Sequence, residues 1–455
     1  MRSLHGIILL LSVLIALLCQ DEATAQTARG NELLRKLSQN FVSLDTMILG
    51  AGHQGSDMPT VRDVSRVDVV REGLQHLDSA LSKRTVAQIG ELMSETGLEL
   101  TGQTYYRLDE GLGFDDEDAV SRYRGKVQAE VNWNFFKSSL YNRAGRVDEL
   151  MIKEEIDRKR YMKEDLGLFV ARQKESFRDF YDSQLRSILV HHIYNLSLLS
   201  DAQEYLLDNE QVSSDELMDI LNEKAEAERL FVSAGGDGQS RGVTDLSTPV
   251  GAVVYVDTLA LFNMIRKTQY DMNVLDLRMK YLDRQAANTS YWNELTLAPF
   301  LRYSYYARSG SGVSNSSNVD VGLSFRFPLS NGVHHKKKSI RAEQCLLEAE
   351  KERVEDKVLE TARLIVNDIV RHNRSIQGEL QRLRKQKDYI AMRVNAYNHS
   401  QGHYDMLARA KEYNKYFECW ERLLAFQYSR DCLIADLQVF LTESSVLDYC
   451  HEIQL

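Results

Sequence analysis

The sequence predicts a mainly helical protein with a few membrane β-strands, built from two copies of a unit that holds two strands and a long helix. Three observations support this prediction. Only four of the 455 residues are proline, which leaves room for very long helices. Two segments, which begin at Val127 and Val319, alternate apolar and polar residues as strands do. A long stretch with coiled-coil spacing follows each segment.

The first 25 residues have the pattern of a secretory signal peptide. Arg2 gives a positive start, residues 6–18 are apolar, and Ala23–Ala25 offers a cleavage site. Cys19 leaves a second interpretation open, a lipoprotein, although Leu18 precedes it where a small residue is usual. We therefore expect a mature chain that starts near residue 26.

Composition argues against several classes of function. A formal net charge of −10 disfavours a nucleic-acid partner. The carboxylates are spread along helix-like sequence without a Ser/His or Cys/His constellation, so we expect no catalytic site and no enzyme activity. After the first 25 residues, no apolar run approaches the ~20 residues of a membrane helix, so membrane entry would use strands. Cysteines without metal-site spacing predict free buried thiols and neither metal nor cofactor: Cys345, Cys419, Cys432 and Cys450.

Strands are predicted most clearly when Val127 is placed over Val319, an offset of 192 positions. Apolar residues then coincide at alternate positions, and a second strand candidate precedes each copy. Spans of about ten alternating residues suit an outer-membrane barrel, whereas a soluble sheet of two hairpins is the alternative. The predicted strands cover about 98–108, 123–136, 295–307 and 318–328.

Long helices with a coiled-coil seam follow the strands. Apolar positions step by four and three between Tyr181 and Leu199, and again between Ile365 and Tyr397. A similar sequence recurs at the far end of both helices, which predicts helix–turn–helix tips near 208–214 and near 398–405. The predicted division is a signal peptide at 1–25, a first structural repeat at 26–232, an equatorial connector loop at 233–256 and a second repeat at 257–455.

Four strands do not close into a barrel. Transmembrane barrels have at least ~8 strands, and open strand edges are not tolerated in lipid. Two chains would supply eight strands, whose interior is filled by side chains, whereas three would supply twelve strands and an open lumen. The polar inward residues suit a water-filled lumen, so we expect a homotrimer in contact with outer-membrane lipid. The polar strand positions would face this lumen: Gln128, Glu130, Asn132, Asn134, Asp320, Ser324 and Arg326.

Acidic residues gather near both predicted tips. A threefold axis would repeat them around the narrow periplasmic end, where they would favour cations. Tip solubility and favourable charge at helix N-termini form the alternative interpretation. The candidates for this periplasmic aperture are Asp208, Glu210, Asp215 and Asp405.

A basic segment, His334 to Lys338, follows the last predicted strand. Adjacent histidines diverge on a helix, so the segment does not predict a metal site. The lysines suit lipid headgroups or other polyanions, and a solvated helix start is the alternative. Arg143 and Arg146 occupy the same place in the first copy, and together the two copies would form a basic collar below the membrane.

The sequence resembles the TolC-type outer membrane efflux family, the outer membrane factors. The resemblance rests on VGLSFRFPLSNG at Val321–Gly332, on the tip motif QGHYDMLARA from Gln401, and on the approach to a strand, YDMNVLDLRMKYLDRQ, from Tyr270. It covers essentially the whole mature chain, although Phe136 in the first copy stands where the second has Pro328.

The resemblance implies a homotrimer with a 12-stranded β-barrel on a coiled-coil α-helical barrel, placed in the outer membrane and periplasm of a Gram-negative bacterium. Such a protein would be the passive exit duct of a tripartite efflux or type I secretion system. It would be gated at its periplasmic tip and would dock with a periplasmic adaptor and an inner-membrane pump. Two alternatives remain, a duct that exports proteins rather than small molecules and a non-conducting periplasmic coiled-coil scaffold.

Overall fold

The computed structural model describes residues 28–49, 66–114, 120–134, 140–208, 214–236, 252–290, 296–308, 314–326, 332–399, 406–442 and 444–454. The predicted signal peptide lies outside these residues. Two compact units are present. The helical unit comprises Met1–Ser65, Leu168–Asn263 and Thr361–Leu455, and the sheet unit comprises Arg66–Gly167 and Met264–Glu360.

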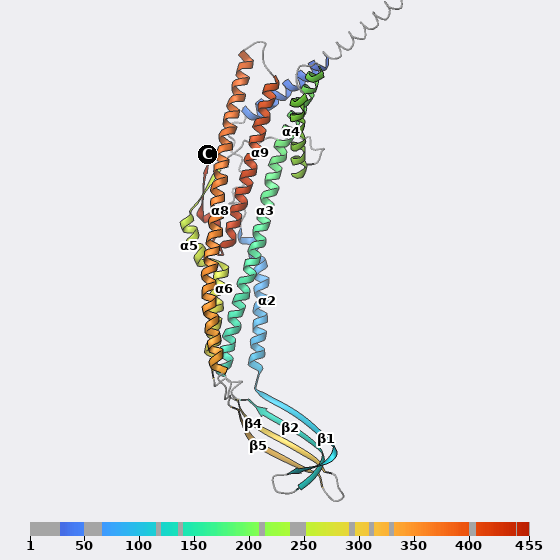
Figure 1. The fold of residues 1–455 in the computed structure, drawn as a ribbon, viewed down its shortest axis with the longest axis vertical. Coiled ribbons are helices and arrows are strands. Elements are labelled where there is room, and N and C mark those ends of the chain that lie inside the picture. Colours follow the sequence, from blue (N-terminus) through green and yellow to red (C-terminus); the bar gives the residue numbers. More distant parts are fainter. Residues whose placement is uncertain are drawn as a thin grey trace, which may run out of the picture. The chain divides into compact units, whose positions relative to one another are not determined.

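A helix over residues 28–49 opens the described chain, and most of the other described residues are helical as well (Figure 1). The other helices are α2 (Arg66–Ser94), α3 (Leu140–Asp208), α4 (Ser214–Ser233), α5 (Thr258–Thr268), α6 (Tyr270–Asn288), α8 (Gly332–His399) and α9 (Met406–Leu437). The strands are β1 (Leu98–Phe114), β2 (Val120–Trp133), β3 (Ala252–Val256), β4 (Thr296–Arg308), β5 (Ser316–Arg326) and β6 (Cys450–Gln454). Two short 3₁₀ helices precede β6: Gln438–Phe440 and Val446–Tyr449.

The two longest helices, α3 and α8, have 69 and 68 residues and contribute to both units. Neither contains a proline, so no backbone donor is lost and no ring clashes with a preceding carbonyl. None of the described helices has a stretch that is long and apolar enough to cross a bilayer.

The sheet unit contains a four-stranded antiparallel sheet, in the order β1–β2–β4–β5 (Figure 1). The outer pairs, β1–β2 and β4–β5, are hairpins, and β2–β4 joins the hairpin of the first copy to that of the second. The strand β1 continues to Phe114, beyond the predicted end near 108, because its pairing resumes after an irregularity between Tyr106 and Gly111.

Helix packing completes the sheet unit. Leu275 and Leu282 of α6 form a buried cluster with Ile340 and Leu347 of α8. Ion pairs flank the packed helices, with Lys351 Nζ 2.6 Å from the Asp276 carboxylate. Similar pairs join α2 to α3, where Arg84 Nη2 lies 2.6 Å from Asp157 and Arg158 Nε lies 3.1 Å from Asp78.

Many residues of the predicted coiled-coil seams are buried in the core of the helical unit. On α3, Ile188, His192, Asn195 and Leu199 are all at most 4% exposed, and the seam positions Ile369, Ile376, Leu383 and Ile390 on α8 are at most 3% exposed. His192 Nδ1 lies 2.7 Å from the Glu421 carboxylate on α9, so this histidine is a packed residue that holds two helices together.

The connector predicted at 233–256 is only partly a loop. Residues 252–256 form β3, which pairs antiparallel with β6. Asn373 of α8 covers the outer edge of β3, since its side-chain amide donates to the Val254 carbonyl at 2.7 Å and accepts from the Val254 N–H at 3.4 Å. Residues 237–251 lie outside the described chain. Because the partner strand is nearly 200 positions away, local periodicity gave no sign of this pairing.

Candidate functional site

One face of the four-stranded sheet is apolar and uncovered. Cross-strand neighbours such as Leu100, Val131, Leu301 and Val321 lie in one row through all four strands. Leu100 is 75% exposed and Val321 is 79% exposed. Burial of one such side chain contributes on the order of 1.5–3 kcal/mol, so this face would gain much from an apolar environment. Further exposed residues of the face are Leu98, Val127, Trp133, Tyr303, Val319, Leu323 and Phe325.

The opposite face of the sheet is polar. Because side chains alternate between faces, every residue in register with Glu130 shares its side of the sheet. From β1 to β5 this row contains Thr101, Glu130, Arg302 and Asp320.

Most of the predicted lumen residues share the polar face. Gln128, Glu130, Asn132, Asp320 and Ser324 all occupy its positions on β2 and β5, and so does Arg326 at the end of β5. Asn134 directly follows β2, and its backbone N–H donates to the Gly97 carbonyl at 2.8 Å. The structure therefore brings residues of both copies onto one surface.

Two cations of the polar face did not appear among the predicted lumen residues. Arg302 Nε donates to Glu130 at 2.8 Å, and its guanidinium carbon lies 4.9 Å from the centroid of the Phe300 ring. Lys126 Nζ lies 5.2 Å from the centroid of the Tyr306 ring. Both residues occupy in-phase polar positions of predicted strands, so the alternation that identified Glu130 also contained the signal for Arg302.

The sheet ends in two open edges. Within the described residues, β1 pairs with β2 alone and β5 pairs with β4 alone. The outer N–H and C=O groups of both strands therefore lack a strand partner in this part of the single chain. Open edges of this kind are suited to pairing with another strand.

Two of the predicted aperture residues are described. Asp208 is the last residue of α3, Asp215 lies in the first turn of α4, and both are exposed. Arg29 Nη1 lies 3.9 Å from Asp208, and Arg29 Nη2 lies 3.4 Å from Glu204, so Arg29 offsets part of the acidic charge here. Sequence reasoning missed Arg29, because it is separated by 175 positions from Glu204. The other two aperture residues lie outside the described chain: Glu210 and Asp405.

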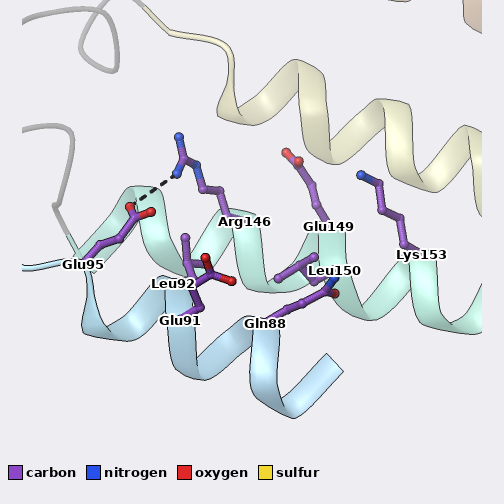
Figure 2. A pocket seen from close by; sticks show the side chains of 8 residues that line it. All are labelled: Gln88, Glu91, Leu92, Glu95, Arg146, Glu149, Leu150 and Lys153. Carbon is purple, nitrogen blue, oxygen red and sulfur yellow. Dashed lines mark ion pairs between the residues drawn. The ribbon is translucent and has the colours of Figure 1, made fainter. Parts of the chain in front are cut away.

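A pocket of about 330 Å³ lies along α2 and α3 in the sheet unit, and Figure 2 shows its lining. Four of the five charged side chains that line it contact a partner. Arg146 Nη1 lies 3.9 Å from Glu95, Glu149 accepts a hydrogen bond from Asn288 at 2.7 Å, and Lys153 Nζ lies over the Tyr281 ring. The lining residues include no serine, cysteine or histidine. We therefore interpret the pocket as a polar contact region between packed helices.

The structure also gives the positions of four cysteines and of the side chains that could bind a metal ion. All four described cysteines are free, as expected. The expectation that they are buried is wrong for Cys345, which is exposed on α8, because this position lies off the buried stripe that contacts α6. Within the described residues, no group of three or more His, Cys, Asp or Glu side chains is arranged to hold a metal ion.

Comparison with known proteins gives similarity in structure alone. No family model matches the sequence, and no curated protein matches it in sequence. Several solved structures match in fold. The outer-membrane channel OprN aligns with a TM-score of 0.53 and 12% identity over 82% of this chain and 88% of its own.

Two further structures agree. The open state of the Neisseria gonorrhoeae MtrE outer membrane channel aligns with a TM-score of 0.51 and 10% identity, covering 82% of this chain and 86% of its own. The outer membrane protein VceC from Vibrio cholerae aligns with a TM-score of 0.50 and 14% identity, covering 81% and 93%. The chain therefore shares its fold with solved outer membrane channels, as the resemblance to the TolC-type family predicted.

Proposed function

We propose that three copies of this chain close into a 12-stranded β-barrel in the outer membrane of a Gram-negative bacterium, continued by an α-helical barrel across the periplasm. The observation that carries the proposal is the sheet with an exposed apolar face, a polar face and two open edges. In lipid, every backbone polar group needs a partner, so the strands have to close. Four strands are too few to close, and twelve leave an open lumen.

The two faces then have distinct environments. The apolar face, with Leu100, Val321 and Phe325, contacts lipid, where its exposed side chains are favourable. The polar face lines a water-filled lumen, and the candidate lumen residues are Gln128, Glu130, Asn132, Asn134, Asp320, Ser324 and Arg326. Open edges of β1 and β5 pair between neighbouring chains and complete the ring.

The barrel acts as a passive exit duct. The fold shared with outer membrane channels supports this function. The duct receives substrates from an inner-membrane pump through a periplasmic adaptor, as part of a tripartite efflux or type I secretion system. Its gate lies at the periplasmic tip, where Asp208, Glu210, Asp215 and Asp405 form an acidic aperture that favours cations.

Conductance in planar bilayers tests the proposal. The purified full chain should form a heat-modifiable trimer and give channel currents. Absence of both would leave a non-conducting scaffold as the better account and would overturn the duct.

A matched pair of variants on β5 tests which face contacts lipid. Val321→Lys places a charge on the apolar face, where a cation near the bilayer centre costs roughly 2–4 kcal/mol, so insertion and conductance should fall sharply. Ser324→Lys places the same charge on the polar face and should insert normally with an altered ion preference. Equal insertion of the two variants would contradict the proposed orientation.

A further inference from the structure

The first ten residues of α8 carry strong positive charge. Residues 332–341 contain four Lys or Arg residues, two histidines and no acidic residue, and the first acid of the helix is Glu343. We call its outward-facing residues the basic patch: His334, His335, Lys336, Lys338 and Arg341.

Packing fixes the direction in which the basic patch points. Val333, Ile340 and Leu347 are 2%, 4% and 7% exposed and recur every seven residues, so they form one stripe on α8. Ile340 and Leu347 of this stripe pack against α6. The helix cannot rotate without exposing the stripe, and the patch residues are consequently held on the surface.

The cations of the patch are not neutralised by acidic neighbours among the described residues. Lys336, Lys338 and Arg341 make no ion pair with any residue that the structure describes, whereas Lys351 further along α8 is paired with Asp276. Such unshielded like charges raise the potential over this surface and attract anions.

The corresponding cations of the first copy are used differently. Arg143 donates to the backbone carbonyls of Met93, at 3.3 Å, and of Glu95. Arg146 lies 3.9 Å from the Glu95 carboxylate. The charge of the first copy is therefore weaker than that of the second, because Glu95 offsets Arg146 and the Arg143 guanidinium is directed to backbone carbonyls at the end of α2.

The patch lies close along the chain to the apolar face of the sheet. Five residues separate Arg326, the end of β5, from Gly332, the start of α8. Six Cα steps span at most ~22 Å. The apolar face of β5 ends at Phe325, which is 64% exposed. If β5 crosses the apolar layer of a membrane, the patch therefore lies within reach of the phosphate layer at its surface.

We infer that the basic patch binds the phosphate headgroups of anionic phospholipids at the periplasmic surface of the outer membrane. Bound headgroups would set the depth of the strands. This inference rests on the proposed function, since it needs the strands to span the membrane. Charge complementarity and continuity with the apolar face of β5 select a lipid surface as the partner.

Lipid selectivity tests the inference. The full chain is reconstituted into phosphatidylcholine bilayers that contain spin-labelled phosphatidylglycerol or spin-labelled phosphatidylcholine, and electron paramagnetic resonance gives the relative association of the two lipids. The test variant is Lys336→Gln/Lys338→Gln/Arg341→Gln. The matched control, Arg363→Gln/Arg384→Gln/Lys385→Gln, removes three exposed cations further along the same helix.

The wild type and the control should prefer phosphatidylglycerol, and high salt should weaken this preference. The test variant should lose most of it, since one cation near an anionic surface changes association by roughly five-fold. An unchanged preference in the test variant would overturn the inference.

Conductance in the same bilayers separates this inference from the proposed function. Normal currents in the test variant, together with a lost lipid preference, support both. Normal currents with an unchanged preference overturn the headgroup site alone. A wild-type chain that neither inserts nor conducts overturns the duct and, with it, the headgroup site.

Discussion

Arg302 Nε lies 2.8 Å from the Glu130 carboxylate, and this ion pair joins residues 172 positions apart in the chain. Glu130 belongs to the hairpin of the first copy and Arg302 to that of the second. Each hairpin pairs locally, so the β2–β4 junction is where the two copies become one sheet. A one-residue slip there would move every side chain to the other face. The ion pair favours the register in which both polar faces coincide.

Reversing one charge of this ion pair should destabilise the fold, and reversing both charges together should restore most of the stability. Glu130→Arg places like charges opposite each other, and Arg302→Glu does the same with the other sign. The two side chains are 15% and 37% exposed, so we expect each reversal to cost about 1 kcal/mol, within the range of cross-strand pairs. The double swap should recover most of the loss. Thermal unfolding followed by circular dichroism measures this coupling, and additive losses would show that the pair does not set the register.

Asn195 connects three helices in the core of the helical unit. Its side-chain nitrogen donates to the Ala410 carbonyl at 3.0 Å and to Asn414 at 2.6 Å, and its oxygen accepts from Asn40 at 3.0 Å. Asn195→Ala removes the shared partner and leaves the buried amides of Asn40 and Asn414 with fewer bonds. We expect a loss of about 2–3 kcal/mol in the free energy of unfolding, measured with urea.

A surface asparagine provides the control for this network. Asn367 lies on the exposed side of α8, and Asn367→Ala should change the unfolding free energy by less than about 0.5 kcal/mol. Equal losses for the two variants would mean that the network around Asn195 contributes nothing specific.

Periodic patterns within single segments predicted the helix seams and the two faces of the strands. They did not predict contacts between segments that are far apart in the sequence. The seam through Ile188 and Leu199 repeats within a few turns, so the period of one helix reveals it. Strand alternation likewise identified Glu130 and Asp320. The paired strands β3 and β6 have five residues each and lie far apart in the sequence. Neither strand is long enough for its alternation to be recognised in the sequence. The pairing of Arg29 with Asp208 was hidden for the same reason, because only the folded helices bring the two side chains together.

The thiols of Cys345 and Cys450 should react at different rates in the folded protein. Cys345 is exposed, whereas Cys450 is buried, and burial raises the pKa of its thiol to about 12. The thiolate is the reactive form, so at pH 8 the folded chain holds almost none at Cys450. Cys345 should therefore react rapidly with Ellman's reagent, and Cys450 should react after unfolding in guanidinium. Mass mapping assigns the labelled peptides, and Cys345→Ser should remove the fast phase.

The sign of the pH effect at Cys450 follows from the same shift. Burial makes ionisation of the Cys450 thiol less favourable in the folded state than in the unfolded state. The thiol therefore contributes a stabilisation that is fully present below pH 9, the ordinary pKa of a thiol, and is lost as the pH rises from there toward 12. Cys450→Ala should flatten this part of the stability profile. Parallel profiles for the wild type and the variant would contradict the assignment.

Ion preference should report the charge balance at the end of α3, where Arg29 lies within 3.4 Å of Glu204 and 3.9 Å of Asp208. All three side chains are more than half exposed, so their ion pairs contribute little to stability and Arg29→Gln should fold normally. In the proposed trimer this variant removes three positive charges beside the aperture, so reversal potentials at low salt should shift toward stronger cation preference. Asp208→Asn should shift them in the opposite direction. Arg35→Gln, an exposed cation on the same helix, is the matched control, and a shift equal to that of Arg29→Gln would show that proximity to Asp208 does not decide the preference.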